Sequence, residues 1–179
     1  DAIKCARLFK EHADEIEGIL VVLPNFGDER GVAETIEMSG LRVPILVQAY
    51  PDDLGQLTVE RRRDAFCGKI SVCNNLSQYG YPFSLTDLHT VHPKSASFRH
   101  DLEQFLGVCR VVNGLRGARL GAIGARVGAF NTVRYSEKIL QQAGITVTTV
   151  DLSEILGLAG SLAENDPAVV SRLAAIEGY

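Results

Sequence analysis

The sequence lacks tryptophan, has one methionine and holds only four cysteines among its 179 residues. The cysteines form no C-x-x-C pair, and their spacing matches no zinc ribbon. Free thiols in a cytoplasmic protein are therefore expected, rather than a disulfide framework or a structural zinc site. The residues concerned are Cys5, Cys67, Cys73 and Cys109.

Long apolar runs and an excess of positive charge are also absent. No run approaches the roughly 20 residues of a membrane-spanning helix, and no signal peptide is visible. The formal net charge is -4, whereas proteins that bind nucleic-acid backbones normally carry a basic stripe. The one dense basic run, Arg61–Arg63, is flanked by acids and is interpreted as the solvated start of a helix. Neither a membrane nor a nucleic acid is expected as a partner.

The common catalytic signatures are missing as well. The sequence has no H-E-x-x-H, no G-x-S-x-G, no P-loop and no cluster of acidic residues and histidines spaced for a metal. Most glutamates fall on the predicted outer surfaces of helices. The chain by itself therefore shows no self-evident catalytic centre.

What the sequence does contain is an alternation of two hydrophobic patterns. Short continuous apolar runs are typical of strands buried on both faces. Between them, apolar residues recur three and four positions apart, which predicts helices. The predicted strands are 19–23, 44–49, 81–86, 119–123 and 146–150, and the predicted helices are 5–16, 28–40, 60–78, 98–113, 130–143 and further segments to the end.

This alternation predicts an α/β fold, a Rossmann-like parallel sheet with helices on both faces. Because the chain opens at Asp1 instead of methionine and begins with a helix, part of the natural chain is expected to be absent upstream. Functional residues gather at the carboxyl ends of the strands in such sheets. The segments to inspect are thus 24–28, 50–53, 86–92, 124–131 and residue 151.

A glycine-rich turn, Gly121–Gly128, follows one predicted strand and precedes a predicted helix. Asp151 ends the next strand, which is the context of a dinucleotide-binding fingerprint. The glycines are spaced G-x-x-G-x-x-x-G instead of G-x-G-x-x-G, and Phe130 and Asn131 add bulk beside the would-be phosphate pocket. A structural or sugar-contacting loop is therefore favoured over nucleotide binding.

Two histidines, His89 and His92, lie close together near Asp87 and could bind a divalent metal if held on one face. The segment has the composition of a loop that ends at Pro93, and no third and fourth ligand are evident. Hydrogen-bonded surface histidines are the favoured interpretation.

The turn Pro24–Glu29 follows the first predicted strand and carries Asn25 and Phe26. An amide both donates and accepts hydrogen bonds, and an aromatic ring can stack on the C–H face of a sugar. The turn therefore suits a polyol. A helix-capping turn with Phe26 packed inward is an equally good interpretation of the spacing alone.

The last candidate group is Phe66–Lys69 with Asn74 and Asn75, of which Cys67, Gly68 and Lys69 are the residues of interest. Glycine inside a helix costs about 1 kcal/mol relative to alanine, so Gly68 is expected to mark the true start of its helix. The three residues would then face the cleft. The sequence shows no base that would activate Cys67 as a nucleophile, and a helical lysine is usually solvated.

Four segments together resemble the amino-terminal domain of the L-fucose/L-arabinose isomerase family. They are GILVVLPNFGDERGVAETI, RRRDAFCGKISVCNNLSQYG, FSLTDLHTVHP and LRGARLGAIGARVGAFNTVRYSEKIL. The similarity runs from about Cys5 to Gly157. It implies an amino-terminal α/β domain over residues 1–157 and a helical segment over 158–179 that leads toward a next domain. It also implies that the first strand and helix of the domain are missing upstream of Asp1, because the family's amino-terminal domain starts with them.

The resemblance also implies a function. Members of the family interconvert aldoses and ketoses with a divalent ion, commonly Mn²⁺, whose ligands lie in later domains outside this chain; none is expected to bind here. The amino-terminal domain packs in a homotrimer or homohexamer, where its loops face the sugar of a neighbouring subunit. The residues carried over as sugar contacts are Asn25, Phe26, Cys67, Gly68, Lys69, Arg126, Phe130 and Asn131.

Two functions therefore remain open. The chain is either the sugar-facing domain of an aldose–ketose isomerase, not catalytic alone, or a non-catalytic module that binds a sugar or nucleotide or joins subunits. Phe26 stands where some family members have tryptophan, which permits stacking but leaves the identity of the sugar open.

Overall fold

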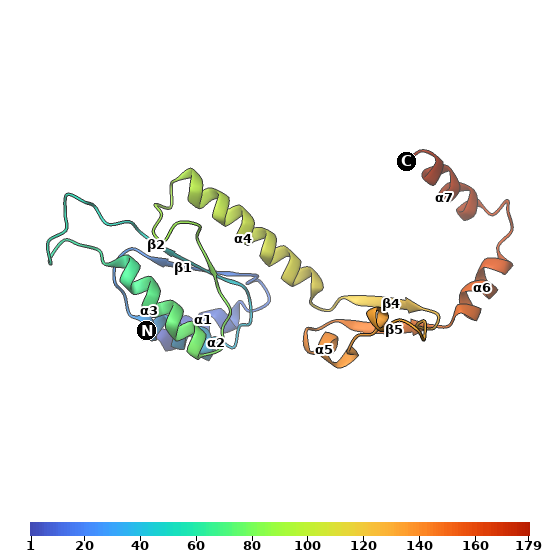
Figure 1. The fold of residues 1–179 in the computed structure, drawn as a ribbon, viewed down its shortest axis with the longest axis horizontal. Coiled ribbons are helices and arrows are strands. Elements are labelled where there is room, and N and C mark those ends of the chain that lie inside the picture. Colours follow the sequence, from blue (N-terminus) through green and yellow to red (C-terminus); the bar gives the residue numbers. More distant parts are fainter. The chain divides into compact units, whose positions relative to one another are not determined.

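The computed structural model describes residues 1–179 and divides into two compact units, Asp1–Gly114 (unit 1) and Leu115–Tyr179 (unit 2). The chain is a mixed α/β protein, as predicted (Figure 1). Unit 1 contains α1 (Ala2–Glu11), β1 (Ile19–Leu23), α2 (Glu29–Ser39), β2 (Ile45–Ala49), α3 (Ala65–Gln78), β3 (Ser84–Leu85) and α4 (Ala96–Leu115, whose last residue belongs to unit 2). Unit 2 contains β4 (Arg119–Ile123), η1 (Asn131–Val133), α5 (Glu137–Gln142), β5 (Thr146–Val150), α6 (Leu152–Ser161) and α7 (Pro167–Glu177).

The sheet of unit 1 is parallel, in the order β1-β2-β3. Val21 pairs with Val47, and Val47 pairs with Leu85. Every residue of the central strand β2 is buried. The largely apolar segment that predicted this strand is therefore explained by its position between two neighbours and two layers of helices. Its one polar residue, Gln48, is buried with its amide donating a hydrogen bond to the carbonyl of Val91.

Helices cover both faces of this sheet, as predicted (Figure 1). Alternate residues of β2 point to opposite faces. Val47 packs in a core with α2 and α3, whose buried residues include Ile36 and Leu76. Leu46 packs in a second core with Phe98, Phe105 and Cys109, all on α4.

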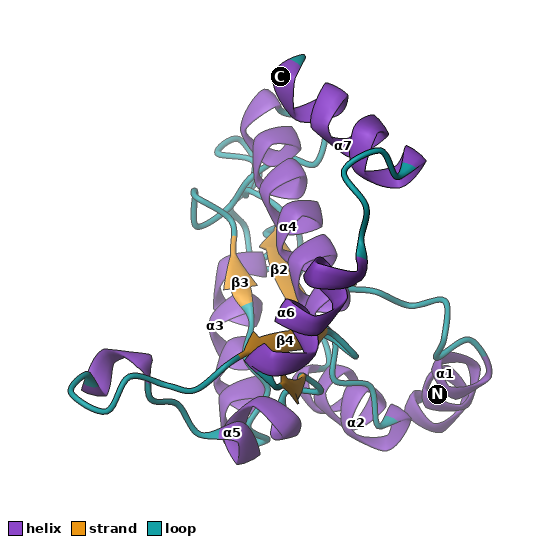
Figure 2. Ribbon diagram, turned by 90° about the vertical axis from the view of Figure 1, so that its right-hand side faces the viewer, coloured by secondary structure: helices purple, strands orange, loops and turns teal.

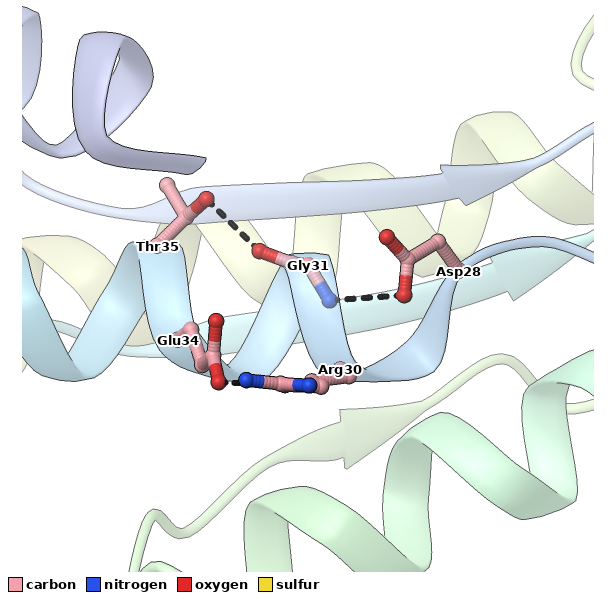
Figure 3. Close-up of polar contacts among 5 residues, drawn as sticks. All are labelled: Asp28, Arg30, Gly31, Glu34 and Thr35. Carbon is pink, nitrogen blue, oxygen red and sulfur yellow. Dashed lines mark hydrogen bonds and ion pairs between the residues drawn. The ribbon is translucent and has the colours of Figure 1, made fainter. Parts of the chain in front are cut away.

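Helix α2 begins and ends where its capping residues predict. The Asp28 carboxylate accepts a hydrogen bond of 2.9 Å from the amide of Gly31, which satisfies one of the free donors of the first turn (Figure 3). Gly40 ends the helix with a φ of 72°, a left-handed conformation that glycine adopts without strain.

The prediction for the start of α3 is wrong. The helix begins at Ala65 instead of residue 60, and Arg61–Arg63 lie in a loop. The carboxylate of Asp52 accepts hydrogen bonds from the amides of Arg63 and Asp64, which closes the loop ahead of the helix. Gly68 lies inside the first turns of α3 and does not mark its start.

Other boundaries differ by a few residues. Helix α1 ends at Glu11, and turns replace the predicted helix up to residue 16. Strand β3 is reduced to two residues, whereas α4 extends over 20 residues. No helix in the structure combines the length and the apolar character needed to cross a membrane.

Unit 2 has a two-stranded parallel sheet, in which Gly121 pairs with Thr148. The helix predicted over 130–143 is divided into η1 and α5, because Ser136 caps the start of α5. Figure 2 shows α6 and α7 as separate helices joined by a loop. No residue of unit 2 is buried. The predicted domain division after residue 157, a position within α6, stays a prediction.

Candidate functional site

The carboxyl ends of the three strands of unit 1 form one edge of the sheet, here called the carboxyl edge. It comprises residues 24–28 after β1, Tyr50 after β2 and residues 86–92 after β3. The loop 51–64 and the first turn of α3 complete it. In Figure 1 this loop (teal) projects beyond the strands. The topology therefore brings together the first three segments that the strand pattern selected.

The turn that carries Phe26 lies directly against α3. A Cβ atom added to Gly68 would lie 3.3 Å from the Cα atom of Phe26 and 3.5 Å from the amide nitrogen of Gly27. The absence of a side chain at Gly68 thus permits the close approach, and the 25–26 and 67–69 segments, predicted separately, are neighbours in the structure.

The two candidate residues of the turn both reach the surface. The ring of Phe26 is 49% exposed, so the alternative in which it packs inward as core is not what the structure shows. The side-chain amide of Asn25 donates a hydrogen bond of 2.7 Å to the carbonyl of Phe26. This bond orients the amide and leaves its oxygen available as an acceptor. Cys67 is also exposed at the same edge.

Lys69 is placed differently from its neighbours, because its side chain is buried, with 4% exposed. Its ammonium group donates hydrogen bonds to the hydroxyl of Thr86 at 2.8 Å and to the carbonyl of His89 at 3.0 Å. Burial lowers the pKa of Lys69, while nearby Cys73 and Asp101 oppose the shift. The ammonium group of Lys69 therefore already binds the 86–89 loop. A direct contact of Lys69 with a sugar stays a prediction.

Aromatic rings line the carboxyl edge. His89 stacks on Phe66 with ring centres 5.1 Å apart and an angle of 25° between the planes. His92 meets Tyr50 edge to face, with ring centres 5.5 Å apart. The guanidinium of Arg63 lies 5.4 Å from the centre of the Tyr50 ring.

Two residues of the edge were not predicted as sugar contacts: Phe66, although it belongs to the last candidate group, and Arg63. Phe66 directly precedes Cys67, and Arg63 is the last residue of the basic run. The sequence does not show, however, which side chains meet across loops. Both histidines are exposed at the surface. The ring of His89 stacks on Phe66, and the Nδ1 atom of His92 accepts a hydrogen bond from the amide of Lys94.

The remaining candidates, Arg126, Phe130 and Asn131, lie in unit 2 and are described within it. Arg126 forms an ion pair of 2.8 Å with Glu137 and lies 4.0 Å from the centre of the Tyr135 ring. Hydrogen bonds to Glu137 and Tyr135 raise the pKa of Arg126. Phe130 is 56% exposed and directly precedes η1.

The glycine-rich turn does not open a regular α-helix, which a dinucleotide fingerprint requires. Asp151, the residue that would hold a ribose, caps α6 by accepting hydrogen bonds from the amide and hydroxyl of Ser153 at 2.8 and 2.6 Å. These bonds lower the pKa of Asp151. The geometry therefore does not favour the nucleotide-binding alternative.

The residues present do not fit a metal centre. No group of three or more histidine, cysteine, aspartate or glutamate side chains comes together in the structure in a way that could hold an ion. A catalytic Mn²⁺ site normally needs such a set of oxygen and nitrogen ligands. Manganese ligands outside this chain stay a prediction.

Comparison with known proteins adds a family to this geometry. Residues 1–116 match the sequence model of the family described as "Fucose/sulfoquinovose isomerase, N-terminal domain". A search of curated proteins found no match. The matched region covers all of unit 1, including the whole carboxyl edge, and takes in more than half of the 179 residues. The chain therefore belongs to the N-terminal domain family of fucose/sulfoquinovose isomerases.

Proposed function

We propose that this chain supplies the sugar-facing domain of a metal-dependent aldose–ketose isomerase that acts on a sugar like L-fucose or L-arabinose. The family membership supports the class of enzyme. The observation that carries the proposal is the contact of Gly68 with the Phe26 turn, because it gathers an exposed ring, an oriented amide and a thiol at one edge of a parallel sheet.

Each residue has a role that suits its position. The half-exposed ring of Phe26 packs on the C–H face of a sugar, and the free oxygen of the Asn25 amide accepts a bond from a hydroxyl. Cys67 borders the same surface. Lys69 holds the 86–89 loop and thereby fixes His89 against Phe66, so its part is to shape the surface from behind.

The reaction itself moves hydrogen between C1 and C2 of the sugar. In this proposal the chain binds and orients the sugar, while Mn²⁺ and its ligands belong to other domains of the assembled enzyme. Arg126, Phe130 and Asn131 would supply further sugar contacts from unit 2. The assembly would be a cytoplasmic homotrimer or homohexamer.

A non-catalytic assembly module is the second candidate, and one observation favours it. Unit 2 exposes many large apolar side chains and buries no residue, as expected for a surface that another protein covers. Examples are Ile123 at 61%, Leu156 at 63% and Ile139 at 66% exposure.

An assay with added Mn²⁺ separates these candidates. The chain alone should show no turnover of L-fucose or L-arabinose at any Mn²⁺ concentration, and turnover would contradict metal ligands outside it. Sugar binding, followed through the backbone NMR signals of residues 24–28 and 66–69, should be measurable. Absence of sugar binding, together with self-association, would support the assembly module instead.

The variant Phe26→Ala tests the surface directly. It should weaken sugar binding by about tenfold, the effect of losing roughly 1.4 kcal/mol, while the melting temperature changes little because the ring is half exposed. Leu54→Ala is the matched control, since Leu54 is 85% exposed on the neighbouring loop and has no proposed sugar contact. A large loss of stability from Phe26→Ala would identify Phe26 as a core residue.

A further inference from the structure

Arg63 connects three parts of the carboxyl edge. Its guanidinium donates a hydrogen bond of 3.0 Å to the carbonyl of Pro24 and lies over the ring of Tyr50. Its own carbonyl accepts a hydrogen bond of 2.6 Å from the amide of Phe26. One residue at the end of loop 51–64 therefore holds the Phe26 turn at two points, one on each side of Asn25.

Arg63 is itself held by Asp52 at the other end of the loop. The Oδ1 atom of Asp52 accepts hydrogen bonds from the amide of Arg63 at 2.6 Å and from that of Asp64 at 3.3 Å. Asp64 has a φ of 50°, a left-handed conformation in which aspartate is one of the tolerated residues. The backbone conformation at Asp64 therefore points the amides of Arg63 and Asp64 at the same carboxylate oxygen of Asp52.

We propose that Arg63, held by Asp52, is a positioning residue for sugar recognition. This inference rests on the proposed function, because it concerns how the Phe26 turn is placed for the sugar. Arg63 need not touch the sugar: its two bonds fix the backbone on both sides of Asn25, and the contact with Gly68 fixes the far side of the turn.

A turn on a loop holds binding residues imprecisely unless neighbouring residues fix its backbone. Binding residues must be held within about 0.5 Å of their productive positions, and loops alone rarely achieve this. A hydrogen bond with one charged partner is stronger than a neutral one, and a planar guanidinium adds direction. Loss of the guanidinium should therefore loosen the turn while the buried core of the sheet stays intact.

The test uses three variants of the full chain: Arg63→Ala, Arg63→Lys and, as the matched control, Arg61→Ala. Arg61 lies on the same loop, is exposed, and its side chain forms no hydrogen bond or ion pair. Two quantities are measured for each: amide hydrogen exchange at Phe26, and the affinity for L-fucose by NMR titration. Thermal melting checks that the fold is retained.

Arg63→Ala should speed exchange at the Phe26 amide and weaken L-fucose binding, each by about tenfold, and Arg61→Ala should change neither. Arg63→Lys should recover part of both, because an ammonium can reach the Pro24 carbonyl but does not lie flat over Tyr50. Equal affinities for Arg63→Ala and Arg61→Ala, in a wild-type chain that binds L-fucose, would overturn the positioning role alone.

The two proposals fail in different ways. If the wild-type chain binds no sugar while Arg63→Ala still accelerates exchange at Phe26, the sugar-facing function is contradicted, and with it the recognition role of Arg63. If exchange at Phe26 is unaltered by Arg63→Ala, the positioning role is contradicted whatever the chain binds.

Discussion

Gly68 and the backbone of Phe26 are in contact: a Cβ atom on Gly68 would lie 3.3 Å from the Cα atom of Phe26. The atoms nearest to that Cβ are all backbone atoms of the Phe26 turn, which cannot rotate away as a flexible side chain would. The contact between the Phe26 turn and α3 therefore requires glycine at position 68, although glycine inside a helix lowers stability relative to alanine.

The first prediction concerns Gly68→Ala. Helix propensity gains about 1 kcal/mol, but the new methyl group must displace the Phe26 turn by a few tenths of an ångström. Stability measured by denaturant unfolding should thus change by less than about 1 kcal/mol, while affinity for L-fucose falls several-fold.

Gly107→Ala in α4 is the matched control, because the only atom near its new Cβ would be the end of the flexible Arg110 side chain, at 3.8 Å. Gly107→Ala should raise the free energy of unfolding by up to about 1 kcal/mol and leave sugar binding unchanged. If Gly68→Ala is stabilised as much as the control and binds sugar normally, the contact does not shape the site.

The second prediction concerns Lys69 and pH. Burial lowers the pKa of Lys69 in the folded chain, whereas in the unfolded chain lysine keeps its proton up to about pH 10.4. Between the two pKa values the unfolded state binds more protons, so this group makes the free energy of unfolding rise with pH. Lys69→Met removes the group at similar volume.

The free energy of unfolding of the wild type, minus that of Lys69→Met, should therefore increase as the pH rises toward about 10.4, the pKa of lysine in the unfolded chain. Denaturant unfolding followed through the amide signals of α3 measures it. Lys4→Met, at an exposed position of α1, controls for the loss of one positive charge. A difference that stays flat or decreases with pH would show that burial does not perturb Lys69 in solution.

Much of unit 1 could be predicted from the sequence because its signals are local. The apolar run of β2 reflects burial on both faces, and the Asp28 cap with Gly40 at the other end fixes α2 within the chain itself. The segments at the strand ends were also found, since a parallel sheet must bring them to one edge.

What the sequence could not predict depends on contacts between distant residues. The start of α3 was misplaced because Asp52 takes the amides of Arg63 and Asp64, a bond across 11 residues that no local pattern reveals. The burial of Lys69 likewise depends on a loop that lies 17 to 20 residues further along. Long-range polar contacts of this kind outweigh local helix preference.

The third prediction tests how α4 packs near the start of β1. A Cβ atom added to Gly18 would lie 2.5 Å from the sulfur of Cys109 and 3.2 Å from the ring of Phe105. Both side chains belong to the buried core on the α4 face of the sheet. Since a packed core does not yield freely, Gly18→Ala should destabilise unit 1 by about 1–3 kcal/mol.

Cys109→Ala removes the atom that the new methyl group would meet first. The double variant should therefore be less destabilised than the sum of the single variants, by an interaction free energy of about 0.5–3 kcal/mol. Denaturant unfolding of the wild type, both single variants and the double variant completes the cycle. Cys67→Ala replaces an exposed thiol of α3 and should show no coupling with Gly18→Ala. Strict additivity at Gly18 and Cys109 would mean that α4 does not approach the start of β1 as closely as the structure shows. Sugar binding at the opposite, carboxyl edge should be unaffected by Gly18→Ala and Cys109→Ala, alone or combined, wherever the variant remains folded.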